Sequence, residues 1–372
     1  MTGAPHDPTR RTATLGAAAL LLAGCSSSRM TAAPSTSDAP KPSRSPSPTP
    51  SAAGPVQIVP PTGAPSAAWR RVADRAPTVA PQVSVLAGTL SGDSTLRLAH
   101  RSGPANPQPL ASMVKLFVLV AVAEAVRSGT LRWSGQLTLQ ATDAAAGSGS
   151  LIARPAGSRV TVQEAARLMM QVSDNTATDL LIRTLGQDAL AKAVASTGNA
   201  HPDRLKPLIT IREDMWLEWS SDPAAVAARR SWPGASTARR TELLKPATAP
   251  GSPVPAATGP GVVPRWQSGL GYFATPEDIA RAHITLHRLA QVRGLEPLHT
   301  IRQVPDTGIR FPAPWRNTAF KGGTVVGVQT GSWYAESPAG DQVLVVMAAS
   351  SGSVVPSAFN ALAQSAADKL AR

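Results

Sequence analysis

Residues 110–120 read LASMVKLFVLV, with a serine and a lysine three positions apart at the start of an apolar run. The run continues to about Val126 and predicts a buried helix. In a helix, Ser112 and Lys115 lie one turn apart on the same face, so that the lysine amine can reach the serine hydroxyl. A buried lysine loses its proton readily and can then activate a serine nucleophile. A helix start also favours an oxyanion, because its free N–H groups and positive dipole end point there.

The same spacing occurs by chance in core helices that have a polar first turn. The Ser112 stretch alone therefore leaves two interpretations open, a nucleophilic site and an ordinary core helix. Other segments of the chain have to separate them.

The first 25 residues have the pattern of a secretory signal. Arg10 and Arg11 precede an apolar stretch, residues 15–23, which is too short to span a bilayer. Residues 22–25, Leu-Ala-Gly-Cys, resemble the bacterial lipoprotein signal, and this implies that Cys25 is lipidated and becomes the mature N-terminus. Cys25 is the only cysteine, so no disulfide can form. We expect an exported protein that is lipid-anchored to the outer face of the cell membrane. The arginine pair fits both general secretory and twin-arginine export.

Residues 26–66 are rich in Ser, Pro, Ala and Thr and have no hydrophobic periodicity. This composition predicts a disordered tether that proline stiffens. The folded domain is expected over residues 67–372, which is ample for a sizeable core.

The formal net charge is +13, and most of the excess comes from arginine. Aromatic residues make up only 4% of the chain and no helix carries a run of basic residues. We therefore expect no nucleic acid partner. Anionic wall polymers or lipid headgroups are the partners that this charge favours for an exported protein.

The folded part predicts strands at both ends of a helical middle. A helix over residues 69–75 and two strands come first, and strands return late, before an amphipathic helix near the C-terminus. The predicted strands are residues 83–87, 95–99, 324–328, 331–335 and 342–347, and the last helix is 356–369. This order predicts an α/β (α+β) sandwich, with one antiparallel sheet built from both chain ends, helices on its faces and an inserted all-helical lobe.

Two further motifs follow the Ser112 stretch. Ser173-Asp174-Asn175 ends a helix that Thr161-Val162-Gln163-Glu164 opens as a capping box, and Phe320-Lys321-Gly322-Gly323-Thr324 leads into the late strands. The order Ser-x-x-Lys, Ser-Asp-Asn, Lys-x-Gly resembles class A β-lactamases and penicillin-binding proteins. The 61-residue spacing from Ser112 to Ser173 is similar to that of the family. The resemblance covers about residues 70–370 and implies a β-lactamase/transpeptidase-like fold.

The resemblance implies three catalytic residues. Ser112 would be the acylated nucleophile and Lys115 its general base. Ser173 would relay a proton to the leaving nitrogen, because a hydroxyl both donates and accepts. The substrate would be a β-lactam or a wall peptide of the D-Ala type, and the enzyme would be a monomer that needs no cofactor or metal.

The resemblance also assigns substrate-binding positions. Asn175 would hydrogen-bond the substrate amide, and Lys321 would help to bind a substrate carboxylate. Gly323 and Thr324 would line the site, and the backbone N–H groups of Ser112 and Thr324 would form the oxyanion hole. The alternative is that Ser-Asp-Asn is only a capped helix break and Lys-Gly-Gly only a strand entry.

The chain departs from the family where deacylation is concerned. Class A enzymes carry a Glu-x-x-Leu-Asn loop whose glutamate activates the deacylating water, and no such motif follows Asn175. The nearest carboxylates are Glu213 and Asp214, and Thr210-x-x-Glu213 is better interpreted as a capping box. The chain is therefore expected to acylate and to deacylate slowly.

The residues expected to bind a substrate carboxylate also depart from the family pattern. Lys321-Gly322-Gly323 lacks the usual central hydroxyl, unless Thr324 or Thr330 replaces it, and no Lys or Arg occurs in 322–368. An esterase or amidase acting on an uncharged acyl substrate is therefore a second hypothesis. A catalytically silent cell-envelope binding lipoprotein is the third.

Two other features have no assigned function. His283 and His287 lie four apart on a predicted helix, and without a third ligand they are interpreted as a surface or interface pair. Residues 246–264 are rich in Pro and Gly and form a loop that either shapes the substrate cleft or is disordered.

Overall fold

The computed structural model describes residues 54–92, 94–311 and 315–371. The predicted signal peptide, the Cys25 lipidation site and most of the predicted tether lie outside these residues. No helix in the described ranges combines the length and the apolar character needed to cross a bilayer.

The centre of the fold is a six-stranded sheet in the order β1-β3-β2-β10-β9-β8. Every neighbouring pair is antiparallel except β1 and β3, which are parallel. The strands are β1 (Gln57–Val59), β2 (Gln82–Ser91), β3 (Thr95–Ser102), β8 (Arg316–Val325), β9 (Val328–Glu336) and β10 (Asp341–Ala349). Because β2 from the first part of the chain pairs with β10 from the last, the predicted sheet built from both chain ends is confirmed.

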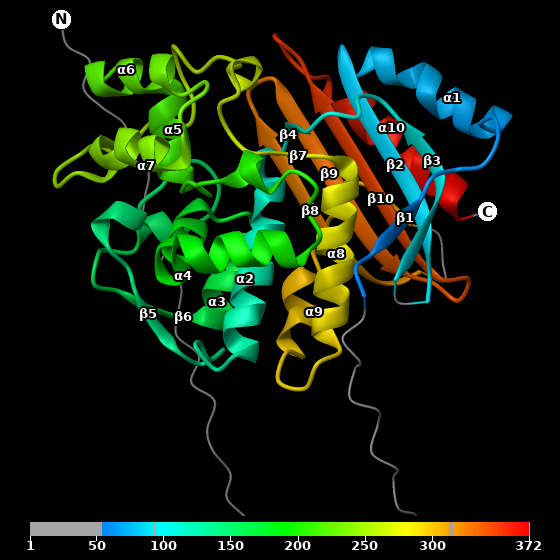
Figure 1. Ribbon diagram of the computed structural model, residues 1–372, viewed down its shortest axis with the longest axis horizontal. Helices are drawn as coiled ribbons and strands as arrows, with labels where there is room; N and C mark the ends of the chain where they lie inside the picture. Colours follow the sequence, from blue (N-terminus) through cyan, green and yellow to red (C-terminus); the bar gives the residue numbers. More distant parts are fainter. Residues whose placement is uncertain (1–53, 93, 312–314, 372) are drawn as a thin grey trace, which may run out of the picture. The chain divides into compact units, whose positions relative to one another are not determined.

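Helices cover both faces of the sheet, as Figure 1 shows. The helices α1 (Ala67–Arg75) and α10 (Pro356–Leu370) pack together on one face, and α8 (Pro276–Ala290) packs on the other. Residues 343–349 of β10 are buried throughout, as expected of a strand covered on both faces. One apolar core lies under α1 and α10, and a larger one joins α8 to the helical lobe.

The helical lobe is built around α2 (Lys115–Arg127), which is buried on nearly every side. A helix that is apolar all round has to lie inside the protein, so the predicted core helix is confirmed. Of the other helices, α3 (Val162–Gln171) and α4 (Asn175–Ser196) pack against α2. The remaining helices of this part of the chain are α5 (Ile211–Trp219), α6 (Pro223–Ser231), α7 (Thr237–Leu244) and α9 (Pro297–Arg302). The prediction of an all-helical lobe is wrong in one detail, because β5 (Gln136–Thr138) and β6 (Arg159–Thr161) form a two-stranded ribbon there.

Two other predictions need correction. The predicted tether 26–66 is too long, because Gln57–Val59 form β1, which adds a parallel edge to β3. The histidines of α8 are not a surface pair. His283 is fully buried and its Nε2 lies 2.9 Å from Ser332 Oγ, while the ring of His287 stacks on Tyr334. Both histidines face the sheet rather than solvent.

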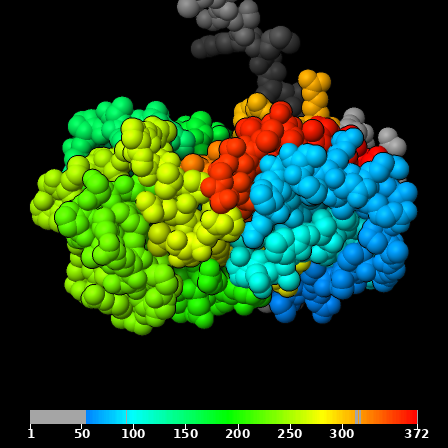
Figure 2. Space-filling view, turned by 90° about the horizontal axis from the view of Figure 1, so that it is seen from above, coloured from blue at the N-terminus to red at the C-terminus, as the bar shows by residue number. Residues whose placement is uncertain are grey.

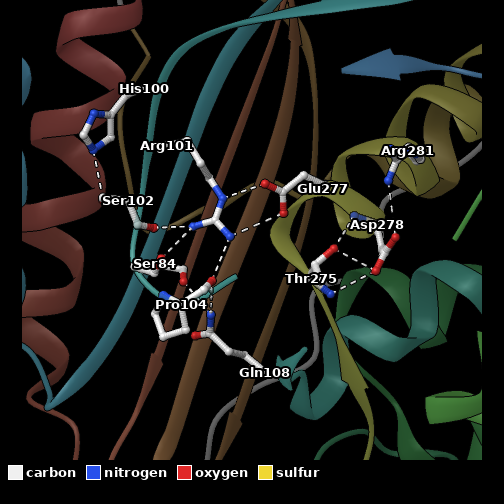
Figure 3. Close-up of polar contacts among 11 residues, drawn as sticks. Ser84, His100, Arg101, Ser102, Pro104, Gln108, Thr275, Glu277, Asp278 and Arg281 are labelled. Carbon is white, nitrogen blue, oxygen red and sulfur yellow. Dashed lines mark hydrogen bonds and ion pairs between the residues drawn. The ribbon is translucent and has the colours of Figure 1, made fainter. Parts of the chain in front are cut away.

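The segment that leads to Ser112 is tied to α8 and the strand before it (Figure 3). Arg101 on β3 forms an ion pair with Glu277 at 2.6 Å and donates to the Pro104 carbonyl at 2.8 Å. Next, β4 (Gln108–Pro109) pairs with β7 (Phe273–Ala274). These contacts fix the chain just before the predicted nucleophile.

Arg212 holds the Pro- and Gly-rich loop 246–264. The guanidinium is buried and donates to the carbonyls of Ala247, Ser252 and Ala144 at 3.0, 2.7 and 3.0 Å. The helix that carries Arg212 is itself anchored by Asp179, which accepts from the first two N–H groups of α5. Figure 2 shows the yellow segment that includes this loop between the green lobe and the red end of the chain. The loop is therefore an ordered wall of the molecule.

Replacing Arg212 by Met should destabilise the fold, because three carbonyl groups, at Ala144, Ala247 and Ser252, lose their charged donor. We expect a loss of about 3 kcal/mol in the free energy of unfolding. Chemical denaturation of the full-length protein measures it, with Arg230→Met, an exposed arginine on α6, as the control. Equal stability of the two variants would contradict the role given to Arg212.

Candidate active site

Ser112 lies in a 3₁₀ turn, Ala111–Val114, that runs directly into α2. The regular helix begins at Lys115, three residues later than the predicted start at Ser112. Ala111 has a φ of +47°, a left-handed conformation that strains a residue with a Cβ. Leu110 is held on both sides, since its N–H donates to the Tyr272 carbonyl at 2.9 Å and its carbonyl accepts from Thr330 Oγ1 at 2.9 Å. The backbone at the half-buried Ser112 is thus positioned by its surroundings.

The Lys115 amine is fully buried and has three acceptors. It donates to the Ser173 carbonyl at 2.6 Å, to Ser173 Oγ at 3.1 Å and to Asn175 Oδ1 at 2.8 Å. The sequence predicts a contact between this amine and Ser112 Oγ. Within the described part of the chain, Ser112 Oγ is not one of the amine's hydrogen-bond partners. Burial, and then the charge of Lys321, hold the pKa of Lys115 well below its ordinary value. A neutral amine keeps two of the three donors and gains a lone pair that can accept a proton.

Ser173-Asp174-Asn175 forms a sharp turn before α4. Ser173 has a φ of +56°, and its Oγ accepts from Lys115 at 3.1 Å and from Lys321 Nζ at 3.0 Å. Asp174 caps α4 through Ala177 N–H at 2.8 Å. Because two amines occupy the lone pairs of Ser173 Oγ, its own proton is free to be donated elsewhere.

The same turn fixes a Gly-rich loop opposite it. Asp174 Oδ2 accepts from the N–H groups of Ser150 and Leu151, both at 2.8 Å, and Asn175 Nδ2 donates to the Ala146 carbonyl at 2.7 Å. A Cβ at Gly149 would lie 2.2 Å from the Asp174 carboxyl group, and the φ of this glycine is +100°. Glycine is therefore required where the loop meets Asp174. Residues 145–151 thus form one wall of the site, and the sequence motifs did not predict it.

Lys321 on β8 completes the group of amines. Its Nζ donates to Ser173 Oγ and to the Gly322 carbonyl at 2.6 Å, and burial lowers its pKa to about 7. Thr330 and Thr324 are the two residues whose hydroxyl could replace the one missing from Lys321-Gly322-Gly323. Thr330 is buried, and its hydroxyl donates to the Leu110 carbonyl. Thr324 is exposed beside the site, so it is the hydroxyl able to meet a substrate.

Two cavities meet at Ser112. The first, here called the lysine cleft, has a volume of about 470 Å³ and is lined by Ser112, Ser148, Ser173, Lys321, Gly323 and Thr324, among others. The second, here called the loop pocket, measures about 550 Å³. Ser112, Ser148 and Thr324 also line the loop pocket, together with Asn175, Asp214, Met215, Trp219, Ala257, Val262 and Tyr272. The loop 246–264 thus shapes the cleft, as one of the two interpretations predicts.

The charges that line these cavities are few. Among the described lining residues, Lys321 is the one cation and lies in the lysine cleft, so no arginine of the helical lobe reaches in. Asp214 is the one charged residue in the described lining of the loop pocket. Within the described residues no His, Cys, Asp and Glu side chains group as a metal site would require.

The structure thus brings together Ser112, Lys115, Ser173, Asn175, Lys321, Gly323 and Thr324, all seven site residues that the sequence predicts within the described ranges. Glu213 lies outside this group. It forms the predicted capping box, with its Oε2 accepting from Thr210 N–H at 2.7 Å.

Comparison with known proteins agrees with this arrangement. Residues 70–237 match the model of the beta-lactamase enzyme family. A β-lactamase from Sphaerobacter thermophilus has a TM-score of 0.55 at 20% identity, over 81% of this chain and 94% of its own. A class A β-lactamase from Mycobacterium abscessus has a TM-score of 0.54 at 16% identity, over 82% and 100%. PBP-A also has a TM-score of 0.54 at 16% identity, over 85% and 98%. A search of curated proteins found no match.

The fold is that of the class A β-lactamases and penicillin-binding proteins. The segment that matches the family model contains Ser112, Lys115 and Ser173.

Gly323 is required where β8 meets Ser112. A Cβ at this position would lie 2.6 Å from Ser112 N and 2.7 Å from the Leu110 carbonyl. Gly323→Ala should displace the Ser112 N–H group and lower the rate of acylation by about 100-fold, the effect of losing one oxyanion donor. Stopped-flow acylation by a chromogenic substrate measures this rate. Gly54→Ala, where a Cβ meets nothing within 4 Å, is the control. An acylation rate of Gly323→Ala within about twofold of that control would show that Gly323 is not needed to place the Ser112 N–H group.

Proposed function

We propose that the chain hydrolyses amide or ester bonds through acylation of Ser112, with β-lactams or D-Ala-type wall peptides as substrates. The observation that carries the proposal is that two buried amines, those of Lys115 and Lys321, both donate to Ser173 Oγ. Two desolvated amines that share one hydroxyl would destabilise a purely structural site, because burying each amine costs free energy.

The arrangement of the two amines around Ser173 supports the following acylation step, in which the Lys115 amine moves within reach of Ser112 Oγ. Neutral Lys115 takes the proton of Ser112 Oγ, which attacks the substrate carbonyl carbon. The N–H groups of Ser112 and Thr324 hold the oxyanion. Ser173 then donates its proton to the leaving nitrogen as the C–N bond breaks. The protonated Lys115 replaces that proton through the 3.1 Å contact with Ser173, which returns the amine to its neutral form.

A solved structure of similar fold supports the choice of probe. A mutant of PBP-A, with a TM-score of 0.55 at 16% identity, is described as an acyl-enzyme complex with penicillin G. For the present chain, the missing Glu-x-x-Leu-Asn loop favours slow release of the acyl group. We therefore propose that the acyl-enzyme accumulates.

The second candidate function, an esterase or amidase on an uncharged acyl group, is favoured by the loop pocket. Met215, Trp219, Ala257 and Val262 line it, and no cation does among its described lining residues. An apolar acyl chain fits such a wall better than a carboxylate does. Hydrolysis of short acyl esters without labelling by penicillin would distinguish this function.

The location of the protein is also proposed from its N-terminal sequence. The lipoprotein-type segment Leu22-Ala23-Gly24-Cys25 favours a lipid anchor on the outer face of the cell membrane. The proline-rich stretch after it would let the enzyme search nearby wall material.

Incubation of the full-length protein with penicillin G should add one penicillin to its intact mass. Ser112→Ala should carry no adduct, because the nucleophile is gone. Ser128→Ala, near the other end of α2, is the matched control and should be labelled like the wild type. An adduct on Ser112→Ala would place the nucleophile elsewhere. No adduct and no ester hydrolysis by the wild type would favour the silent binding lipoprotein.

Cys25→Ser should release the protein from the membrane fraction and abolish incorporation of labelled palmitate, because the acceptor thiol is lost. Fractionation and labelling in a bacterial host measure both effects. Ser26→Ala serves as the control, and continued membrane association of Cys25→Ser would rule out the proposed anchor.

A further inference from the structure

Asp214 is a half-buried residue with a buried carboxyl oxygen, Oδ1, and the acylation step does not use it. It lies in the first turn of α5 and lines the loop pocket together with Ser112 and Asn175. Its neighbour Glu213 is committed to the capping box with Thr210, so the two adjacent carboxylates have different surroundings. Of the two, Asp214 is the one that lines the pocket with the nucleophile.

One oxygen of Asp214 lacks a partner. Asp214 Oδ1 is buried and accepts no hydrogen bond from any described residue. The Tyr272 hydroxyl, which lines the same pocket, donates to the Ile209 carbonyl at 3.1 Å instead. A buried acceptor without a protein donor is rare in a folded protein and is costly unless it has a role.

The helix that carries Asp214 is held rigidly. Asp179 of α4 accepts from Ile211 N–H at 2.6 Å and from Arg212 N–H at 2.9 Å, so α5 starts beside the Ser-Asp-Asn turn. Gly271 makes room on the other side, with a φ of +92° and a missing Cβ that would lie 3.9 Å from Asp214 Oδ1. The carboxyl group is therefore a fixed part of the pocket wall.

We propose that Asp214 is the general base that activates water for release of the acyl group from Ser112. This inference rests on the proposed function, since it requires an acyl-enzyme. Ionised Asp214 takes one proton from a water molecule in the loop pocket, and the resulting hydroxide forms the new C–O bond to the acyl carbon. The bond between that carbon and Ser112 Oγ breaks, and the proton held by Asp214 is returned to Ser112 Oγ.

The surroundings of Asp214 set the pH at which this base works. Burial, and then the charge of Glu213, raise the pKa of Asp214 to about 7. Glu218 lies beside it, and burial and the Asp214 charge raise the pKa of Glu218 well above its usual range. Further charged or titratable groups near this cluster are Asp179, Tyr272 and, facing Glu218, Arg265.

The sign of the pH dependence follows from these groups. A carboxyl group must be ionised to act as a base, so deacylation should increase as the pH rises through about 7 and level off above it. Below this range the acyl-enzyme should persist. The slow release expected from the missing loop then applies most strongly at acidic pH.

The test follows the acyl-enzyme of the full-length protein by intact mass after excess probe is removed, from about pH 5.5 to about pH 8.5. Two probes are used, penicillin G and p-nitrophenyl acetate. Wild-type deacylation should rise with pH, whereas Asp214→Asn should acylate normally and deacylate about 100-fold more slowly at about pH 8, without the rise. Asp188→Asn, an exposed aspartate on α4, is the matched control and should keep the wild-type profile.

A structural role would give other results. Asp214→Asn should melt at or above the wild-type temperature at about pH 8, because it removes the cost of ionising a buried group. Asp214→Glu, which keeps a carboxyl group, should keep a pH-dependent limb. Two results would overturn the role of Asp214 and leave the acylation proposal standing. The first is deacylation of Asp214→Asn at the wild-type rate, and the second is a wild-type adduct that is stable even at the alkaline end of the pH range. Failure of both probes to acylate wild-type Ser112 would overturn both.

Discussion

The Lys115 amine has to be held in the core without water, and much of the site meets that requirement. Its three acceptors come from Ser173 and Asn175, which stand side by side only because the chain turns sharply before α4. That turn needs a left-handed residue at Ser173, and the strain is offset by Asp174, which caps the helix and binds the Gly-rich loop. Ala111 is the other non-glycine residue with positive φ in the described part of the chain. Backbone strain is thus concentrated next to the two serines of the site.

A single hydroxyl links the two lobes of the site. Ser173 belongs to the helical lobe and Lys321 to the edge strand of the sheet, and their 3.0 Å contact brings both to one point. Any change that moves β8 away from the lobe separates the amines and raises the pKa of Lys115, because the charge of Lys321 is one of the causes that lower it. The proposed reactivity of Ser112 is therefore coupled to how the sheet packs against the lobe.

Much of this arrangement could be predicted from the sequence, because local signals agreed with the tertiary structure. The caps at Thr161 and Thr210 and the core helix after Ser112 follow from short-range patterns. The predicted bounds of the late hairpin are wrong, because the predicted strand 324–328 contains the turn that joins β8 to β9 at residues 326–327. The three-residue strand β1 carried too little periodicity to recognise, and the burial of His283 depends on Ser332, 49 residues away. The position of Asp214 could not be predicted either, since it depends on Asp179 and on a loop held by Arg212.

The pairing of β2 with β10 has a consequence for how the protein matures. The sheet joins residues that are about 250 positions apart, so its closure belongs to the slow, non-local part of folding. Ser112, Lys115 and Ser173 emerge early from an exporting or synthesising machine, but Lys321 and Gly323 arrive only with the last part of the chain. A nascent chain therefore holds Ser112, the proposed nucleophile, before it holds the strand that completes the site. Under the proposed function, reactivity at Ser112 is a marker of completed folding, and a truncated or stalled chain is expected to be unreactive.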